Sequence, residues 1–272
     1  MAGSLFAIVF PACCSLCHQE LAEAGTIDIC PRCWASLEPW SGAGCARCGL
    51  PFSSERAEDS ATSLCPQCCD EEFEFDMARS YGVYGGRLRA AILQLKFRRR
   101  ERLGKKLGGL LAPTWTSLID TEVAPPPIVV PVPLHRSRQR DRGFNQAELL
   151  AHGLCANVVK ARDGKSPRVE AHCVERIRAT ESQTGLSVEQ RRENVRGVFS
   201  VVRPERVRGR EVVLVDDVMT TGATLSACAA ALKKAGASRV LGLTLARATP
   251  QFPDPDFAEP AQAIDDVERE WR

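Results

Sequence analysis

The sequence predicts an α/β protein with a parallel sheet, preceded by a cysteine-rich module. Ten of the 13 cysteines lie before residue 70, and the chain that follows alternates strand-like and helical patterns. Over residues 212–245, an apolar strand, a helix and a second apolar strand follow one another. Such a unit joins two parallel strands through a crossover helix, so this pattern decides the fold class.

The cysteine-rich module spans residues 1–76 and lacks long periodic segments, so it needs a cross-link to fold. Its C-x-x-C pairs are Cys14/Cys17, Cys30/Cys33, Cys45/Cys48 and Cys65/Cys68. Two such pairs present four thiolates to one tetrahedral zinc, in a closed and therefore structural site. Neighbouring pairs sharing an ion make a double ribbon, although interleaved pairing also fits the spacing. Buried or oxidised thiols are the alternative, which four evenly built pairs disfavour. Cys13, Cys69 and His18 are not assigned as ligands.

Residues 77–248 form the α/β domain, and its elements follow from apolar periodicity. Leucines at helical spacing predict helices near residues 88–95 and 103–111. A short strand is expected at 128–132, and helices at 145–159 and 187–194. Residues 212–215 are a continuous apolar run, typical of a central parallel strand. A helix at 223–235, ended by Gly236, and a strand at 240–245 complete the domain.

The tail, the net charge and the lengths of the apolar runs limit the expected location and partners of the protein. The acidic, proline-rich segment 249–272 predicts a disordered tail, with a short helix at 264–271. A net charge of +2 neither indicates nor excludes nucleic-acid partners. No apolar run is long enough to span a bilayer, and paired cysteines without an export signal indicate a reducing compartment. We therefore expect a cytoplasmic protein without membrane insertion.

Residues 212–224 carry the strongest functional signal. The strand delivers Asp216 and Asp217 to its carboxyl end, where open α/β sheets bind ligands. Adjacent carboxylates there suit hydroxyl groups, directly or through Mg²⁺. The next residues turn the chain into a helix whose amides and dipole attract an anion. Carboxylates that bind a diol, followed one turn later by backbone donors that bind a phosphate, together indicate a ribose 5-phosphate site. The alternative is a solvated Asp-Asp turn with capping threonines.

Three further segments are candidates for function. The loop from Pro133 to Arg138 could meet a pyrophosphate, or be a rigid turn with solvated arginines. Residues 178–190, including Gln183 and Thr184, could be a lid or a plain surface loop. A basic cluster between the domains suits single-stranded DNA because Phe97 can stack on bases; the alternative is a solvated amphipathic helix. The cluster comprises Arg87, Arg89, Lys96, Arg98, Arg99, Arg100, Arg102, Lys105 and Lys106.

The string at 212–224 closely resembles the phosphoribosyl-diphosphate (PRPP) motif of type I phosphoribosyltransferases. With the segments at 130–134, 142–146, 183–186 and 192–194, it resembles ComF-type competence proteins over residues 14–247. The resemblance implies a zinc module joined to a phosphoribosyltransferase fold, acting in natural transformation on incoming single-stranded DNA with DNA-uptake proteins. It also implies PRPP and Mg²⁺ as ligands. By match, Asp216 and Asp217 hold the ribose and are the catalytic candidates. The other PRPP-binding candidates are Met219, Thr220, Thr221, Gly222, Ala223, Thr224, Pro133, Leu134 and Arg136.

Two hypotheses about activity follow from these observations. The first is a Mg²⁺-dependent phosphoribosyltransferase, whose acceptor the sequence does not identify and which could serve nucleobase salvage. The second is a non-catalytic module that senses PRPP and binds single-stranded DNA or protein. Turnover of PRPP with a nucleobase acceptor distinguishes them.

Overall fold

The computed structural model describes residues 13–21, 29–52, 62–70, 72–95, 101–119, 126–158, 167–180 and 188–249. In this part of the chain, five parallel strands form one sheet in the order β1-β7-β6-β2-β3. The strands are β1 (Met77–Val83), β2 (Ile128–Pro131), β3 (Arg168–Val169), β6 (Glu211–Met219) and β7 (Arg239–Arg247). The predicted fold class, a parallel α/β sheet behind a cysteine-rich module, is confirmed.

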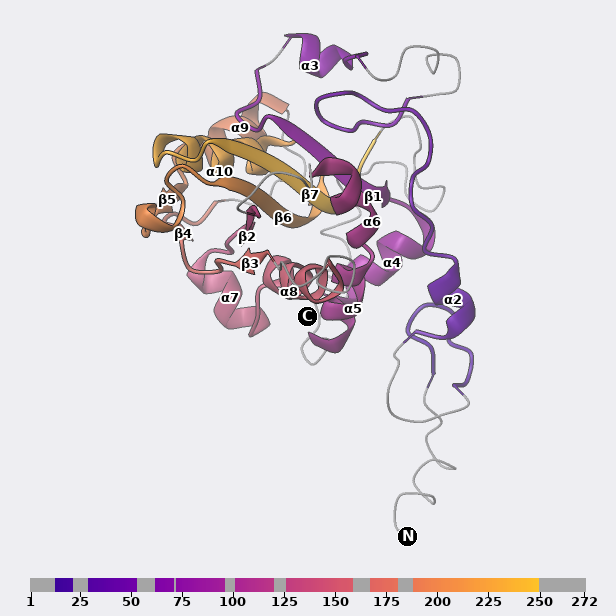
Figure 1. Ribbon diagram of the computed structural model, residues 1–272. Helices are drawn as coiled ribbons and strands as arrows, with labels where there is room; N and C mark the ends of the chain where they lie inside the picture. The colour runs from indigo at the N-terminus through magenta and orange to yellow at the C-terminus, as the bar shows by residue number, and fades with distance from the viewer. Residues whose placement is uncertain are drawn as a thin grey trace.

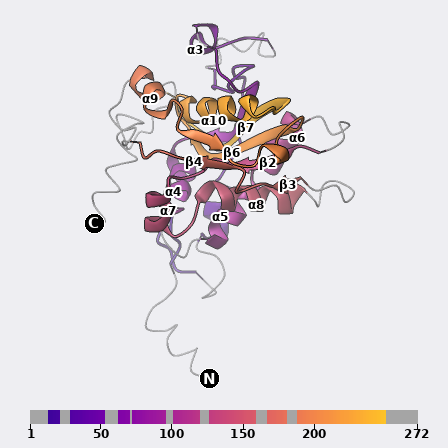
Figure 2. The ribbon, with the colours of Figure 1, turned by 90° about the vertical axis from the view of Figure 1, so that its left-hand side faces the viewer.

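Helices cover both faces of the sheet (Figures 1 and 2). One face carries α10 (Ala223–Lys234), with α9 (Val188–Val195) beside it. The other carries α4 (Gly86–Gln94), α5 (Glu101–Gly109) and α8 (Gln146–Val158). Residues 212–215 in β6 are fully buried, since helices lie on both sides. Val213 and Val215 join the α5 and α8 side, whereas Val212 and Leu214 join the α10 side.

The predicted long elements agree with the structure, and several short ones were not predicted. The sequence predictions omitted β1, β3, α6 (Ala112–Leu118), α7 (Arg136–Arg142), the 3₁₀ turn Pro204–Arg206, and the hairpin of β4 (Val174–Arg176) with β5 (Phe199–Val201). The prediction for β6 was too short. The strand continues past Val215 to Met219, in unbroken register with β7. The predicted helix at 264–271 and the tail beyond residue 249 lie outside the described residues.

The cysteine-rich module lies along the β1 edge of the sheet, with one cysteine group on each face. Cys14, Cys30 and Cys33 belong to the hydrophobic cluster of α4, α5 and α8, whereas the four later cysteines belong to the cluster under α10. The helical turns α2 (Pro31–Ala35) and α3 (Pro66–Asp70) accordingly lie on opposite sides of the sheet (Figure 1). The proposed domain boundary at residue 76 stays a prediction.

Backbone hydrogen bonds attach the module to this edge. The Trp40 amide donates to the Tyr81 carbonyl at 2.7 Å, and the Ala78 amide donates to the Arg47 carbonyl at 2.8 Å. The Tyr81 hydroxyl also donates to the Leu37 carbonyl. These bonds satisfy polar groups of an edge strand that would otherwise face solvent or another chain.

Candidate functional site: two cysteine groups and a phosphate loop

The cysteines gather by neighbouring pairs into two groups of four. The first group is Cys14, Cys17, Cys30 and Cys33, and the second is Cys45, Cys48, Cys65 and Cys68; within each, the sulfur atoms lie within 4.8 Å of one another. The Cys17 and Cys30 sulfurs are 3.7 Å apart, and the Cys48 and Cys65 sulfurs are 3.6 Å apart. A tetrahedral zinc with Zn–S bonds of about 2.3 Å separates its sulfurs by about 3.8 Å. The donor sets therefore fit zinc, in the sequential pairing.

The C-x-x-C turn that presents two cysteines to a metal, here called a knuckle, has the same structure in both groups. The Cys30 amide donates to the Cys14 sulfur at 3.2 Å, and the Cys65 amide donates to the Cys45 sulfur at 3.3 Å. The residue after each first pair has a positive φ, 60° at His18 and 65° at Gly49. Gly49 thus occupies the left-handed position for which glycine is suited. His18 occupies the equivalent position in the first group. Among the described residues, His18 belongs to neither of the two sets whose geometry could hold a metal ion.

Arginines from the sheet domain face the cysteine groups. Arg87 at the start of α4 donates to the Cys33 sulfur. Arg79 on β1 donates to the Ala46 carbonyl at 2.9 Å, inside the knuckle of Cys45 and Cys48. Four thiolates around one Zn²⁺ carry a net negative charge, so cations at this position offset the cost of burying it.

The phosphate loop connects β6 to α10. Thr220, Thr221 and Gly222 make the turn, and Gly222 is the residue before the first helical turn, with φ of +81°. A Cβ at Gly222 would lie 2.9 Å from Met219 Cε and 3.1 Å from Phe73 Cε1. Both the backbone conformation and the packing therefore require glycine here. The Ser226 amide donates to the Gly222 carbonyl at 2.9 Å, which begins the helix.

The two acids of the loop are close neighbours near the end of β6, where the Asp217 amide donates to the Asp216 carboxylate at 2.9 Å. Asp216 shares the α10 side with Leu214, and its nearby charged and titratable groups include Arg176 and Cys228. Burial, and then the charge of Asp217, raise the pKa of Asp216 well above its usual range. The alternation of β6 breaks after Val215, since Val218 packs on the α8 side and Met219 on the α10 side. The carboxyl groups of Asp216 and Asp217 lie close enough to interact directly, so they can act together on one ligand.

Met219 contributes packing rather than a side-chain donor. Its side chain is 2% exposed, and its carbonyl accepts from the Ala248 amide at 2.9 Å and from Arg247 Nη1 at 3.0 Å. Arg247, also 2% exposed, is a buried cation directly behind the loop. Sequence reasoning missed it; the available signal was an arginine ending an otherwise apolar strand.

Pro133 and Leu134 follow β2 at the same carboxyl edge as Asp216. The Val132 amide donates to the Val215 carbonyl at 2.9 Å. Asn145 fixes this segment, since its Nδ2 donates to the Val132 carbonyl at 3.1 Å while its Oδ1 accepts from the Ala147 amide to cap α8. The expected loop to Arg138 is wrong in its second half, because α7 begins at Arg136. Arg136 pairs with Glu175 at 3.1 Å on the surface, and its contact with PRPP stays a prediction.

Comparison with known proteins agrees with this architecture. Residues 5–71 match the double zinc ribbon domain, and residues 172–257 match the phosphoribosyl transferase domain. Competence protein F of Haemophilus influenzae is 34% identical over 239 residues, covering 86% of this chain and 96% of the relative. The chain belongs to the ComF family. The DNA utilization protein YhgH of Escherichia coli K12 is 32% identical over 236 residues, covering 86% of this chain and 96% of YhgH. ComFC of Bacillus subtilis is 25% identical, with 86% and 94% covered.

Within this ComF-family chain, the zinc ribbon match and the cysteine geometry together support structural zinc. Among solved structures, an allosteric regulatory enzyme of purine biosynthesis is similar at 21% identity, covering 57% of this chain and 30% of that one. Its TM-score of 0.35 is too low to carry a functional argument. In the described residues, no helix has the length and apolar character to cross a bilayer.

The predicted lid, residues 178–190, follows β4 and includes the first three residues of α9. Gln183 and Thr184 lie outside the described residues, so their role stays a prediction. At the β4 side, Arg176 donates to the Thr180 hydroxyl and lies over the Phe199 ring, 5.7 Å from its centroid. Arg176 therefore connects the start of this segment to the hairpin and to the surroundings of Asp216.

The described members of the basic cluster differ in exposure. Lys96, Phe97, Arg98, Arg99 and Arg100 lie outside the described residues, so the nucleic-acid prediction for them is untested. Of the flanking residues, Arg87 contacts the first cysteine group and Arg89 is buried. Arg89 is therefore not accessible to DNA, whereas Arg87 is half-buried and its place in a DNA groove stays a prediction. The exposed ones on α5 are Arg102, Lys105 and Lys106.

Proposed function

We propose that this ComF-family protein binds PRPP with Mg²⁺ at residues 216–224 and acts in the handling of DNA taken up by the cell. One observation carries the proposal: two acids and a helix N-terminus meet at the carboxyl edge of a parallel sheet, where such folds bind ligands. Relatives named competence protein F and DNA utilization protein suggest the cellular setting.

Each part of the loop has a distinct task in this proposal. Asp216 and Asp217 together bind the ribose hydroxyls near the end of β6. The first turn of α10, from Ala223, holds the 5-phosphate through backbone amides and the helix dipole. Pro133 and Leu134 line the neighbouring strand end, where the pyrophosphate group would lie. Mg²⁺ fits this donor set because the charge of Asp217 raises the pKa of Asp216, and a divalent cation would offset that repulsion. Bound there, it would supply charge neutralisation to the pyrophosphate.

Calorimetric titration with PRPP and Mg²⁺ tests the binding site. We expect binding by the parent protein and a loss of at least about tenfold in Asp217→Asn, which removes a charged hydrogen-bonding group. Glu211→Gln is the matched control, because Glu211 lies at the opposite end of the same strand and pairs with Arg239 at 3.2 Å. A parent protein that fails to bind PRPP, or an Asp217→Asn variant that binds equally well, would contradict the proposal.

Release of pyrophosphate during incubation with each nucleobase separates transfer from sensing. Turnover abolished in Asp217→Asn indicates a phosphoribosyltransferase. PRPP binding without turnover, together with salt-sensitive binding of single-stranded DNA, indicates a non-catalytic module, since contacts to phosphates weaken as salt rises.

A further inference from the structure

The second cysteine group contacts the phosphate loop directly. Gln67 lies between Cys65 and Cys68 in α3, and its Nε2 donates to the Thr221 carbonyl at 3.0 Å across 154 residues of chain. The acceptor belongs to the turn that presents the first amides of α10. A zinc-ribbon residue thus bonds to the backbone of the candidate ligand site.

This bond fixes the direction of one peptide group. In a trans peptide the carbonyl and the following N–H point opposite ways. Because the Thr221 carbonyl faces Gln67, the Gly222 N–H faces away from the knuckle. Gly222 has φ of +81°. Because glycine adopts positive and negative φ about equally readily, contacts from outside the turn must hold it in this conformation.

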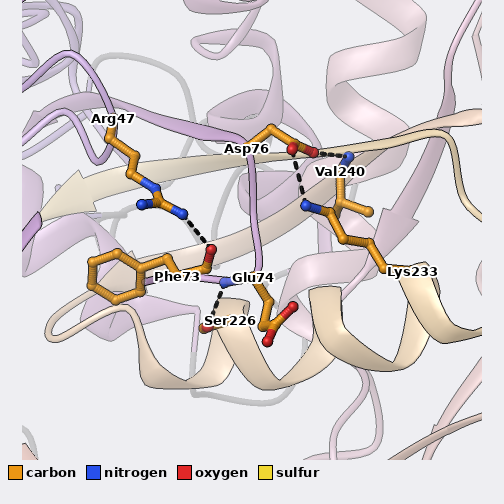
Figure 3. Close-up of polar contacts among 7 residues, drawn as sticks. All are labelled: Arg47, Phe73, Glu74, Asp76, Ser226, Lys233 and Val240. Atoms are coloured by element: carbon orange, nitrogen blue, oxygen red, sulfur yellow. Dashed lines mark hydrogen bonds and ion pairs between the residues drawn. The ribbon is translucent and has the colours of Figure 1, made fainter. Parts of the chain in front are cut away.

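A second contact acts on the same turn. The Phe73 ring would lie 3.1 Å from a Cβ at Gly222, and Phe73 stacks on Phe75 with ring centroids 4.7 Å apart. The Phe73 carbonyl accepts from Arg47 Nη2 at 2.5 Å (Figure 3). In the sequence, Arg47 lies between Cys45 and Cys48. Both knuckles of the second group therefore reach the loop, one through Gln67 and one through Arg47 and Phe73.

The linker after the second group is also bound along α10 (Figure 3). The Glu74 amide donates to the Ser226 hydroxyl at 3.0 Å. Asp76 accepts from Lys233 Nζ at 2.9 Å and from the Val240 amide at 2.7 Å. By contrast, the contacts of the first group run to α4 and β1, through Arg87 and Tyr81.

We infer that Gln67 is a positioning residue for the phosphate ligand, which makes the second cysteine group and the phosphate loop one structural unit. The inference rests on the proposed function in assigning the ligand as a ribose phosphate. Gln67 acts through the Thr221–Gly222 peptide and does not itself need to touch the ligand.

The chain offers a matched control for this inference. Arg32 occupies the same place in the first group, between Cys30 and Cys33 and after Pro31, and its side chain is exposed. Gln67→Met keeps side-chain length, and both Gln67→Met and Arg32→Met keep all eight cysteines of the two groups. The probe is ribose 5-phosphate with Mg²⁺, measured by calorimetry on full-length protein, together with zinc content by mass spectrometry. Hydrogen exchange at residues 220–225 is measured without ligand.

We expect Gln67→Met to retain zinc, to exchange faster at residues 220–225, and to bind ribose 5-phosphate about three- to tenfold more weakly, the effect of losing one hydrogen bond. Arg32→Met should match the parent in all three. Unchanged exchange in Gln67→Met, or the same change in Arg32→Met, would overturn the inference.

Two other outcomes are also decisive. If the parent binds neither ribose 5-phosphate nor PRPP, the proposed function fails, while the ligand-free exchange still decides the coupling. If Gln67→Met loses zinc, Gln67→Ala replaces it, and normal exchange at 220–225 in that zinc-loaded variant would overturn the inference.

Discussion

At the scale of single residues, Asp216 shows a conflict between stability and ligand binding. Its carboxyl is buried beside a second carboxylate, and both effects raise its pKa well above the usual range. A carboxyl whose pKa is higher in the folded protein gives its full contribution to stability below the ordinary carboxyl pKa. That contribution is lost as the pH rises toward the folded pKa. Near neutral pH, the unliganded protein therefore carries a cost at Asp216.

Asp216→Asn should accordingly stabilise the unliganded protein while weakening PRPP binding. We expect a rise in the unfolding midpoint on the order of 3 °C at pH 7.5, because a neutral amide is less costly to bury than a carboxylate. The difference should shrink as the pH is lowered toward the ordinary carboxyl range. Differential scanning fluorimetry of both proteins across pH tests this. A lower midpoint in Asp216→Asn at pH 7.5 would be inconsistent with a costly carboxylate.

Residue identities in the site were predictable where a local pattern carried them. The acids, the threonines and Gly222 follow a buried strand within one short string, so sequence alone located them. The roles of Arg247 and Gln67 were not predicted. Gln67 lies inside a C-x-x-C pair and Arg247 ends an apolar strand, but each acquires its role by bonding to a carbonyl brought close by folding.

At the scale of secondary-structure elements, α5 and α8 approach each other closely at glycines. A Cβ on Gly153 would overlap the Lys105 carbonyl, and one on Gly108 would overlap the Leu150 carbonyl. The two helices can therefore pack backbone to backbone, which brings Leu103, Leu107 and Leu150 into one buried cluster.

Gly153→Ala should force these helices apart and lower the free energy of unfolding by about 2–4 kcal/mol, as overpacking of a tight contact does. Gly109→Ala is the control in α5, because its Cβ would meet the end of the Asn157 side chain, which can move. That control should be near neutral, since alanine favours helix. Urea denaturation measures both. Equal stabilities for the two variants would show that the helices tolerate separation.

Elements were predictable in proportion to their apolar periodicity. Three segments bury the side chains of one face or of all faces, and their apolar patterns therefore predicted β6, α10 and β7. These segments are residues 212–215, 223–235 and 240–245. The helix α7 has no buried residue, and therefore no periodicity for sequence reasoning to detect. The strands β3, β4 and β5 are two or three residues long, too short for any pattern.

At the scale of the whole molecule, the cysteine groups are part of the main hydrophobic clusters. Each group shares its cluster with one face of the sheet. Loss of metal from either group should therefore disturb the sheet domain as well as the ribbon.

Chelation of zinc should lower the unfolding midpoint of the entire chain, by on the order of 10 °C or more, because zinc binding to a ribbon contributes several kcal/mol to folding. Hydrogen exchange should quicken in β6 and β7, not only in residues 13–70. Adding excess Zn²⁺ with the chelator is the control and should restore the parent midpoint. If β6 and β7 keep their protection while the ribbon loses its own, the ribbon folds independently.

The sequence by itself determined the chemistry of this protein: four C-x-x-C pairs for zinc, and a strand, two acids and a glycine turn at the head of a helix. Such features are local, since C-x-x-C spacing and apolar periodicity act between residues a few positions apart.

Only the tertiary structure decided how these parts meet. It placed one cysteine group on each face of the β1 edge and brought Gln67 to Thr221. The hydrophobic effect that drives this packing is non-directional, so apolar patterns say which residues become buried but not which distant partner they find.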